Sequence, residues 1–264
     1  MIKNSFRHYR IFPIIKFLFY FTKNIFSNKR RISFDFCNCC QRRSIFLFIK
    51  LKLQDPRGIS SYDETGFCFF CGSQNRTRAM VNYLENYNLA AKDKIYLPAG
   101  SGPLFNYLKK NFNNKNLFFS DYYDDVSHQK PLIPHMDLMD QNFVDNAFDI
   151  ILSEHVMEHV GDPHKAFKEI CRILKPGGKF IFSIPLQAKN HSVMRVTPDG
   201  KKLLKKFYHL DPLRKKGVLV YTDFSLNDLE SKYIKKSGFR KFKIINSSNH
   251  SKDGIFSTFF EATK

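Results

Sequence analysis

The sequence has few acidic residues, no tryptophan and no long apolar run. Its 264 residues include 24 Asp and Glu against 43 Lys and Arg, which gives a formal net charge of +19. The most apolar run, residues 11–21, is broken by Pro13 and Lys16, and a helix that crosses a bilayer needs about 20 residues. No transmembrane span is therefore predicted. The resulting excess of positive charge indicates a negatively charged partner such as RNA, an anionic membrane surface or a phosphorylated metabolite. AT-rich coding explains part of this excess equally well.

Apolar and aromatic residues make up 43% and 16% of the chain. This content excludes a disordered chain, because burial of so much apolar surface can offset the entropy lost on ordering. The length corresponds to one ordinary domain with a small addition. We therefore expect a folded chain with one main domain.

The positive charge is concentrated near the amino terminus. Residues 1–60 contain 13 Lys and Arg and two acids, a net charge of +11, and the other 204 residues contain 30 and 22, a net charge of +8. No small-x-small cleavage site follows the apolar run, so a cleaved signal peptide is not expected. A helix over residues 14–26 would gather five apolar side chains on one face, those of Ile14, Phe17, Leu18, Phe21 and Ile25.

These features predict a basic amphipathic arm over residues 1–34. Such an arm contacts a membrane surface, here through residues 11–26, or packs on the protein itself or on a partner. The expected location is cytoplasmic, with peripheral contact at the inner membrane face.

Two Cys-x-x-Cys pairs follow the arm, Cys37 with Cys40 and Cys68 with Cys71. Two such turns can direct four thiolates at one tetrahedral ion. A structural zinc ion in a zinc-ribbon-like module over residues 35–74 is favoured over a disulfide pair or metal-free thiols, because a secretory signal is not expected.

Two further cysteines lie outside this scheme. Cys39 could replace either neighbour, Cys37 or Cys40, as a ligand. Cys171 shares the apolar face of a predicted helix with Phe167 and Ile170, and we interpret it as a core thiol.

A helix is predicted to begin near Asn75, directly after the second cysteine pair. Arg76 and Arg78 would then lie in its first turn. They either hold an anionic group of a substrate or, as we favour, pair with carboxylates of the main domain.

From Asp93 onward, short apolar runs alternate with amphipathic segments, which is typical of a parallel sheet with helices on both faces. A strand over residues 94–97, a glycine-containing turn over 98–103 and a helix over 104–112 form the first unit. This arrangement lets the backbone approach a ligand and presents the free N–H groups of a helix terminus to it. The next strand ends at Asp121, about 20 residues beyond the turn, where a carboxylate can accept both hydroxyls of a nucleoside ribose.

The remaining segments continue the alternation up to a closing pair of strands. Asp162 and Pro163 mark the start of one helix and Gly238 the end of another. The expected elements are a buried strand over 147–153, a helix from 163, a strand over 179–185, a helix over 226–237, and hairpin strands over 239–245 and 254–263.

The block from Phe148 to Pro185, FDIILSEHVMEHVGDPHKAFKEICRILKPGGKFIFSIP, resembles the fourth and fifth strands of class I S-adenosylmethionine-dependent methyltransferases of the methyltransferase-domain 11 type. The glycine turn, Asp121 and Asp137 precede it in the expected order. The resemblance implies an α/β fold over residues 75–264, with a Rossmann-like, mostly parallel seven-stranded sheet and a closing antiparallel hairpin. The cysteine pairs followed by Gly-Ser and Arg-x-Arg also resemble a bacterial subgroup in which a zinc-ribbon-like segment precedes this domain.

The resemblance further implies S-adenosylmethionine as the methyl donor and a role for individual residues. The glycine turn would pass beneath the methionine part of the cofactor, an acid would bind the ribose, a further pair would lie beside the adenine, and the end of the fourth strand would floor the methyl-transfer site. The residues at these positions are, in that order, Ala99, Gly100 and Gly102; Asp121; Asp137 and Leu138; and Ser153. Pro98 and Pro103 depart from the family pattern, because many relatives carry an acid and a third glycine there.

Methyl transfer from a sulfonium requires mainly that a nucleophile be held in line with the methyl group in a dry pocket. If the acceptor is a hydroxyl, a base helps, and His155 is our first candidate. Glu158 and His159 are interpreted as groups that cap and orient the segment. Residues 187–221 exceed the minimal fold and would cover the substrate side and select the acceptor.

We predict a methyltransferase that acts on a small-molecule, sugar or lipid-linked acceptor. The alternative is an RNA methyltransferase whose basic N-terminal region grips the phosphate backbone, which is disfavoured because the chain lacks a recognisable RNA-binding module and an Asn-Pro-Pro-Tyr-like tetrad. A non-catalytic binding protein on the same fold is a third hypothesis, suggested by the altered glycine turn.

Overall fold

The computed structural model describes residues 30–49, 65–87, 89–123, 133–187, 189–209, 216–250 and 255–264, together with Leu18 and Thr22. Apart from those two positions, the predicted amphipathic face and the proposed membrane contact through residues 11–26 lie outside the described residues. Within the described part, no helix combines the length and the apolar character that crossing a bilayer requires.

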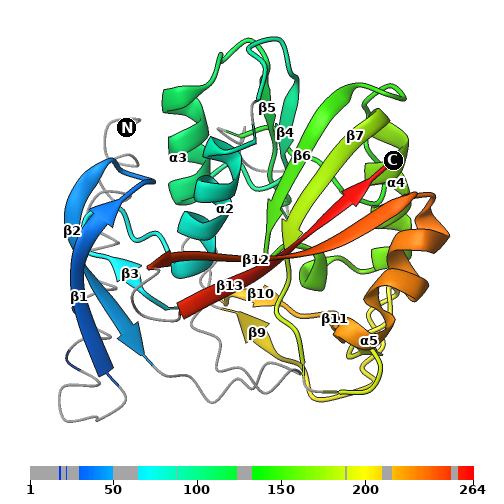
Figure 1. Cartoon of the computed structure of the whole chain (residues 1–264). Coiled ribbons are helices and arrows are strands. Elements are labelled where there is room, and N and C mark those ends of the chain that lie inside the picture. Colours follow the sequence, from blue (N-terminus) through cyan, green and yellow to red (C-terminus); the bar gives the residue numbers. More distant parts are fainter. Residues whose placement is uncertain are drawn as a thin grey trace, which may run out of the picture.

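A six-stranded sheet forms the centre of the molecule, in the order β12-β13-β7-β6-β4-β5 (Figure 1). Its parallel strands are β4 (Ile95–Leu97), β5 (Leu117–Phe119), β6 (Phe148–Glu154) and β7 (Leu174–Ser183). The hairpin of β12 (Lys241–His250) and β13 (Ile255–Thr263) adds to β7 in the antiparallel sense. The predicted Rossmann-like sheet, mostly parallel with a closing hairpin, is confirmed.

The expected seventh strand is reduced, among the described residues, to one parallel bridge between Asp121 and His135 beyond β5. Asp121 N donates to Pro134 O at 2.9 Å, and Met136 N donates to Asp121 O at 2.9 Å. The preceding bond of a parallel ladder would need an N–H at position 134, which proline lacks. The described sheet therefore has six strands and this bridge where seven strands were expected.

Two apolar clusters fill the two faces of the sheet. On one face, α2 (Asn75–Glu85) and α3 (Gly102–Asn111) pack against inward side chains such as Leu152. On the other, α4 (Pro163–Ile173) packs against the alternate residues, such as Phe182 (Figure 1). Apolar residues point to both faces because helices cover both, as the parallel arrangement demands.

The last helical segment spans the predicted residues but is not one α-helix. α5 (Leu226–Asp228) continues as a π-helical turn, η2 (Leu229–Ile234), and a 3₁₀ turn, η3 (Lys235–Ser237). It ends at Gly238, whose φ is +98°. Cys171 is buried beneath this end, in the core, so its interpretation as a core thiol is confirmed.

A second, three-stranded antiparallel sheet lies at one side of the molecule, beside α2 (Figure 1). It consists of β1 (Arg30–Cys37), β2 (Arg42–Ile49) and β3 (Phe67–Cys68). Both pairs of cysteines lie at strand ends or in the turns that follow them. β1 begins at Arg30, so this strand extends across the boundary predicted at residue 34.

The insertion over residues 187–221 contributes two short ladders. β8 (Val193–Met194) pairs with β11 (Thr222–Asp223), and β9 (Tyr208–His209) pairs with β10 (Val218–Leu219). Tyr221 N donates to Glu158 O at 2.8 Å, which joins the insertion to η1 (Met157–His159). Because η1 directly follows β6, the insertion lies near the carboxyl end of that strand.

Candidate cofactor site and cysteine cluster

The turn between β4 and α3 packs against the neighbouring strand β5. Gly100 N donates to Ser120 O at 2.8 Å, and a Cβ at Gly100 would stand only 2.8 Å from Phe119 Cδ2. Gly102 begins α3 with φ +89°, and no described atom lies within 4 Å of the position a Cβ would take. Ser101 makes no side-chain cap hydrogen bond, which leaves the first N–H groups of α3 available to a ligand.

Asp121 lies at the carboxyl end of β5, next to this turn, and is 9% exposed. Its Oδ1 accepts a hydrogen bond from Tyr122 N at 2.8 Å. Beside it, the Tyr96 hydroxyl and Ser120 Oγ are 2.7 Å apart, and burial raises the pKa of Tyr96 to about 12. The phenol is therefore neutral at ordinary pH.

Asp137 and Leu138 lie in the turn that follows the bridge at His135. Asp137 Oδ1 accepts a hydrogen bond from Met139 N at 2.8 Å. The Leu138 side chain is buried in the core with Tyr96. Leu138 can therefore offer a ligand only its backbone groups, and the adenine contact that the family resemblance implies stays a prediction.

The carboxyl end of β6 carries Ser153 and His155. Ser153 is fully buried, and its Oγ has no hydrogen-bond partner among the described residues. His155 N donates to Ser183 O at 2.9 Å, and its φ is +52°, a region that residues other than glycine seldom adopt. The chain therefore bends sharply where the strand ends, and the His155 side chain comes to lie 3.8 Å from Glu158 Oε1.

The two arginines at the start of α2 have different surroundings. Arg76 Nε lies 4.0 Å from Glu154 Oε1, so its predicted pairing with the main domain is confirmed. The same prediction is wrong for Arg78, which is 1% exposed, lies 4.4 Å over the ring of Phe46 and donates from Nη1 to Ser73 O at 2.8 Å. Burial lowers the pKa of its guanidinium, and the neighbouring cysteine sulfurs oppose that effect.

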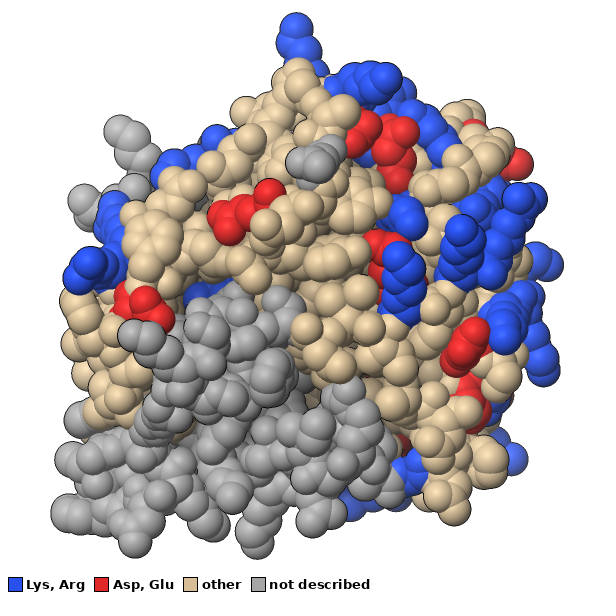
Figure 2. Space-filling view, viewed as in Figure 1, with Lys and Arg blue, Asp and Glu red and all other residues tan. Residues whose placement is uncertain are grey.

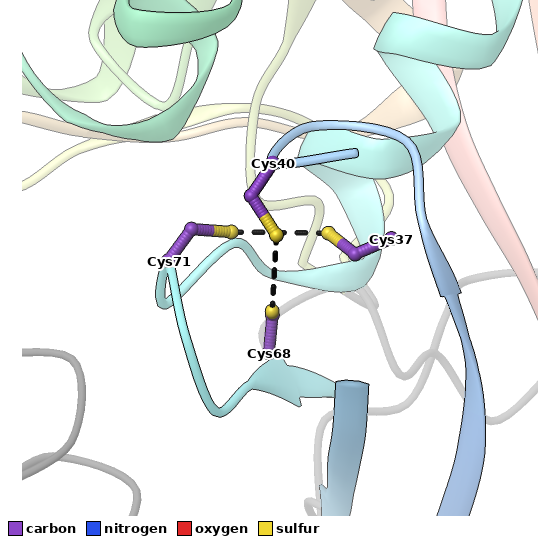
Figure 3. A group of neighbouring side chains, drawn as sticks. All are labelled: Cys37, Cys40, Cys68 and Cys71. Atoms are coloured by element: carbon purple, nitrogen blue, oxygen red, sulfur yellow. Dashed lines mark hydrogen bonds between the residues drawn. The ribbon is translucent and has the colours of Figure 1, made fainter. Parts of the chain in front are cut away.

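Four thiols converge between the ends of β1 and β3 (Figure 3). Cys37 Sγ lies 3.8 Å from Cys71 Sγ, and Cys40 Sγ lies 3.9 Å from Cys68 Sγ. A tetrahedral zinc ion with Zn–S bonds of about 2.3 Å holds its sulfurs about 3.8 Å apart. The structure thus brings the four predicted cysteines to the spacing of a tetrahedral thiolate site.

Cys39 lies outside this group of four and is 6% exposed. Burial raises the pKa of its thiol well above the ordinary value, whereas hydrogen bonds, first from Cys39 and then from Cys40, hold the pKa of Cys37 far below it. The ambiguity left by the sequence is resolved, because Cys37 and Cys40 are the pair whose sulfurs face the second turn.

The two cysteine turns have the same geometry. Gln41 N donates to Cys37 O at 2.7 Å, and Gly72 N donates to Cys68 O at 2.9 Å. Gln41 and Gly72 both have positive φ, +57° and +70°. Each turn thus ends in a left-handed residue that directs both of its sulfurs to the same side.

Polar groups around the four thiols suit a bound cation. Cys68 Sγ donates to Ser44 Oγ at 3.1 Å, and Cys71 Sγ donates to Ser73 Oγ at 3.2 Å. Once the thiols lose their protons, these hydroxyls can rotate and donate to the sulfurs instead. Four thiolates around a divalent ion would carry a net charge of about −2, which the buried Arg78 guanidinium would partly offset.

Sequence reasoning missed one further cluster, formed by Glu158, His159 and His209. It treated Glu158 and His159 as capping groups and His209 as part of the insertion. The His-x-x-Glu-His pattern after β6 was the available signal, but His209 lies 50 positions further along the chain. No periodic pattern could connect positions so far apart.

Comparison with known families agrees with this architecture. Residues 97–182, from the end of β4 to the end of β7, match the family described as "Methyltransferase domain". The matched segment includes the glycine turn, Asp121, Asp137 and Ser153. The match spans 86 of the 264 residues, so this part of the chain resembles a methyltransferase domain, and the strand order of the sheet agrees with that likeness.

Two curated relatives match parts of the chain. A ubiquinone/menaquinone biosynthesis C-methyltransferase of Pseudoalteromonas translucida is 31% identical over 116 residues, which cover 42% of this chain and 41% of that protein. A glycine/sarcosine/dimethylglycine N-methyltransferase of Actinopolyspora halophila is 32% identical over 78 residues, 30% of this chain and 13% of that protein. The chain therefore spans less than half the length of these relatives.

Similar solved structures include S-adenosylmethionine-dependent methyltransferases from two organisms. The protein from Methanosarcina mazei is 15% identical with a TM-score of 0.40, covering 69% of this chain and 96% of its own. The protein from Mesorhizobium loti is 16% identical with a TM-score of 0.45, covering 70% of this chain and 98% of its own. At these identities the likeness concerns the fold alone.

Proposed function

We propose that this protein is an S-adenosylmethionine-dependent methyltransferase that transfers the methyl group by in-line displacement to a small-molecule, sugar or lipid-linked acceptor. The observation that carries the proposal is the position of the open N-terminus of α3 and the Asp121 carboxylate at the carboxyl ends of the adjacent strands β4 and β5. The match of residues 97–182 to a methyltransferase family supports the choice of donor.

Each predicted site residue has a role in this proposal. The turn residues lie beneath the methionine part of the cofactor, the acid at the end of β5 accepts hydrogen bonds from the ribose, the turn after His135 flanks the adenine, and the end of β6 floors the transfer site. In that order they are Ala99, Gly100 and Gly102; Asp121; Asp137 and Leu138; and Ser153. When bound, the cofactor supplies an electrophilic methyl group, and these residues orient it and exclude water.

His155 is the proposed general base for a hydroxyl acceptor. Its ring stands beyond the end of β6 and is 10% exposed at the side chain. A base in this position takes the proton as the acceptor oxygen is methylated. The insertion over residues 187–221, which is joined to η1 next to His155, is the proposed acceptor-selecting element.

Calorimetric titration with S-adenosylmethionine and S-adenosylhomocysteine tests the donor site. We expect the parent protein to bind both, and Asp121→Asn to bind them about 10- to 100-fold more weakly, since hydrogen bonds to a charged group contribute about 1.5–3 kcal/mol. Glu230→Gln is the control, because this acid is half-exposed on η2 and paired with Lys235. If the folded parent protein binds neither compound, the methyltransferase proposal is excluded. Only the hypothesis of a non-catalytic binding protein on the same fold then remains.

Labelled-methyl transfer into fractionated cell extract tests the acceptor. Label in a soluble glycan, small-molecule or lipid fraction supports the proposal, and label in RNA overturns its acceptor class. On the face shown in Figure 2, Lys and Arg side chains gather on the side that carries α5 and are interspersed with acids. RNA affinity that falls steeply with salt would identify such groups as a phosphate-binding surface.

We also propose that Cys37, Cys40, Cys68 and Cys71 hold a structural zinc ion. Their sulfur spacing, the two serine hydroxyls and the buried arginine support it. Elemental analysis of reduced protein should give one zinc ion at these thiols, lost in Cys68→Ser and kept in Cys39→Ala, a buried cysteine of the same module. Retention of this zinc by Cys68→Ser would contradict the assignment.

A further inference from the structure

A cluster of imidazoles surrounds a buried carboxylate at the point where the insertion meets the end of β6. Glu158 is fully buried in η1. Its Oε1 lies 3.6 Å from His159 Nε2 and 3.6 Å from His209 Nδ1. His159 Nε2 and His209 Nδ1 are 3.1 Å apart. Three ligand-type atoms from two distant segments therefore form a nearly equilateral triangle.

The size of this triangle corresponds to one face of a metal coordination tetrahedron. Zinc bonds to imidazole nitrogen and carboxylate oxygen are about 2.0–2.1 Å long, which separates ligand atoms in a tetrahedral site by about 3.3 Å. The observed edges, 3.1, 3.6 and 3.6 Å, bracket this value. The two longer edges, from Glu158 Oε1 to the two ring nitrogens, exceed the distance of a hydrogen bond.

The second nitrogen of His159 supports the same interpretation. His159 Nδ1 lies 2.8 Å from Leu219 O, and a carbonyl oxygen can only accept, so Nδ1 carries the proton. When the ring is neutral, Nε2 presents its lone pair to Glu158 and His209. Metal-bound histidines commonly have this second contact to a backbone carbonyl, which fixes their tautomer and orientation.

The short strands β9 and β10 of the insertion bring these three ligands together. His209 in β9 pairs with Val218 in β10, and β10 also supplies Leu219, whose carbonyl orients His159. Tyr221 N donates to Glu158 O. The insertion therefore both carries one ligand and positions the other two.

We propose that Glu158, His159 and His209 bind a divalent transition-metal ion of the zinc type. The donor set of two imidazoles and one carboxylate suits Zn²⁺ and related ions and does not suit Mg²⁺ or Ca²⁺, which prefer oxygen ligands. Three protein ligands leave one position open for water or an oxygen of another ligand, as in reactive rather than structural zinc sites. Of the three side chains, that of His209 is the most exposed, at 31%, whereas those of Glu158 and His159 are 0% and 14% exposed.

This site goes beyond the proposed function, because transfer from a sulfonium needs no metal. It is also separate from the four-cysteine cluster, since the two share no residue. The alternative is a metal-free network in which His209 Nδ1–H donates to the lone pair of His159 Nε2. The two interpretations predict different metal contents.

The test is zinc titration of the full chain, with its thiols reduced, its four-cysteine site already loaded and any polyhistidine tag removed. The proposal predicts one further equivalent of zinc at micromolar concentrations. His209→Ala should weaken this binding more than about 100-fold, because even loss of an outer-shell partner commonly costs 10- to 100-fold. His191→Ala, at an exposed histidine of the same insertion, should leave it unchanged.

Cobalt distinguishes the two sites spectroscopically. Co²⁺ added to the zinc-loaded chain should give visible absorption without the near-ultraviolet band of thiolate ligation, and His209→Ala should lose that absorption. Glu158→Gln, which keeps the shape of the side chain, should weaken binding as well, and thermal melting shows whether each variant is folded. Absence of a second equivalent in the parent, or its full retention in folded His209→Ala, overturns the proposal. Because no methyl donor is present, neither result bears on cofactor binding.

Discussion

The guanidinium of Arg78 lies 4.4 Å over the ring of Phe46, where the small sheet meets α2. Its Nη1 donates to the carbonyl of Ser73, two positions beyond Cys71. A cation is thus buried directly beside the proposed thiolate site. The charge of one group makes burial of the other less costly.

We expect Arg78→Met to destabilise the zinc-loaded protein by about 3–5 kcal/mol, because it leaves a buried negative centre without its counter-charge. The methionine keeps the apolar contact with Phe46 but loses the hydrogen bond to Ser73 O, so the difference between zinc-loaded and zinc-free protein reports the charge. In reduced, zinc-free protein the thiols can stay protonated, and the loss should be smaller. Urea unfolding with and without zinc measures both values, and equal losses in the two states would contradict this electrostatic role.

Glu261 is 2% exposed, and side chains from two other elements, β7 and α2, donate hydrogen bonds to its carboxylate. Lys179 Nζ donates to its Oε1 at 3.0 Å, and the Tyr83 hydroxyl donates to its Oε2 at 2.6 Å. Lys179→Met should cost stability at the lower end of about 3–5 kcal/mol, since Lys243 Nζ is also 4.0 Å away. In a double-mutant cycle, Lys179→Met with Glu261→Leu should recover much of this loss; simple additivity of the two changes would show that the charges are not coupled.

The two glycines of the turn after β4 should respond differently to alanine. At Gly100 the new methyl group would stand 2.8 Å from Phe119 Cδ2 and 3.1 Å from Ile133 Cγ2, so we expect overpacking that costs about 1–3 kcal/mol and weakened cofactor binding. At Gly102 no described atom is near, and the cost comes from φ of +89°, about 1–2 kcal/mol. Thermal melting and cofactor titration measure the pair. A Gly100→Ala protein with unchanged melting and affinity would show that β5 can shift away.

The Asp223 carboxylate links two residues of the insertion to β11. Burial alone would raise the pKa of Asp223, but Arg195 Nε at 2.6 Å and Lys189 Nζ at 2.7 Å outweigh it and lower the pKa below the ordinary value. The carboxylate therefore stabilises the fold fully above the unfolded pKa of about 3.9, and this contribution is lost as pH falls through the lower folded pKa.

Asp223→Asn should consequently lower the free energy of unfolding by about 1.5–3 kcal/mol at neutral pH. The curves of parent and variant should converge as the pH falls below about 3.9. Urea titrations across the acid range provide the measurement. If the difference in the free energy of unfolding between parent and variant stays constant down to the lowest pH, the carboxylate charge is not the cause of the destabilisation.

Local signals in the sequence were sufficient for most elements. Asp162 accepts a hydrogen bond from Lys165 N at 3.1 Å as the predicted cap of α4, and Gly238 ends the last helical segment. The arrangement of the sulfurs was also predictable from the two cysteine pairs, because each Cys-x-x-Cys turn directs two sulfurs to one side. These preferences depend on residues within one turn of each other, so they can be recognised without the fold.

The same reasoning failed where distant segments meet. Arg78 was expected to face the main domain, but the packing of β2 against α2 brings Phe46 and the thiols to it. The strand beyond β5 was expected in full, but among the described residues it is a single bridge because a proline stands at the next donor position. The roles proposed for the cofactor-site residues stay predictions, which the titrations above address.

By itself, the sequence determined the alternating elements, the two cysteine turns and the likeness to a methyltransferase domain, because capping, periodicity and ligand spacing act over a few residues. Only the tertiary structure decided that Arg78 is buried beside the cysteine cluster and that His209 joins Glu158 and His159. Those relationships depend on contacts between segments tens of residues apart. The shortage of acids in this chain therefore coexists with buried carboxylates such as Glu158 and Glu261, each placed among basic side chains by the fold.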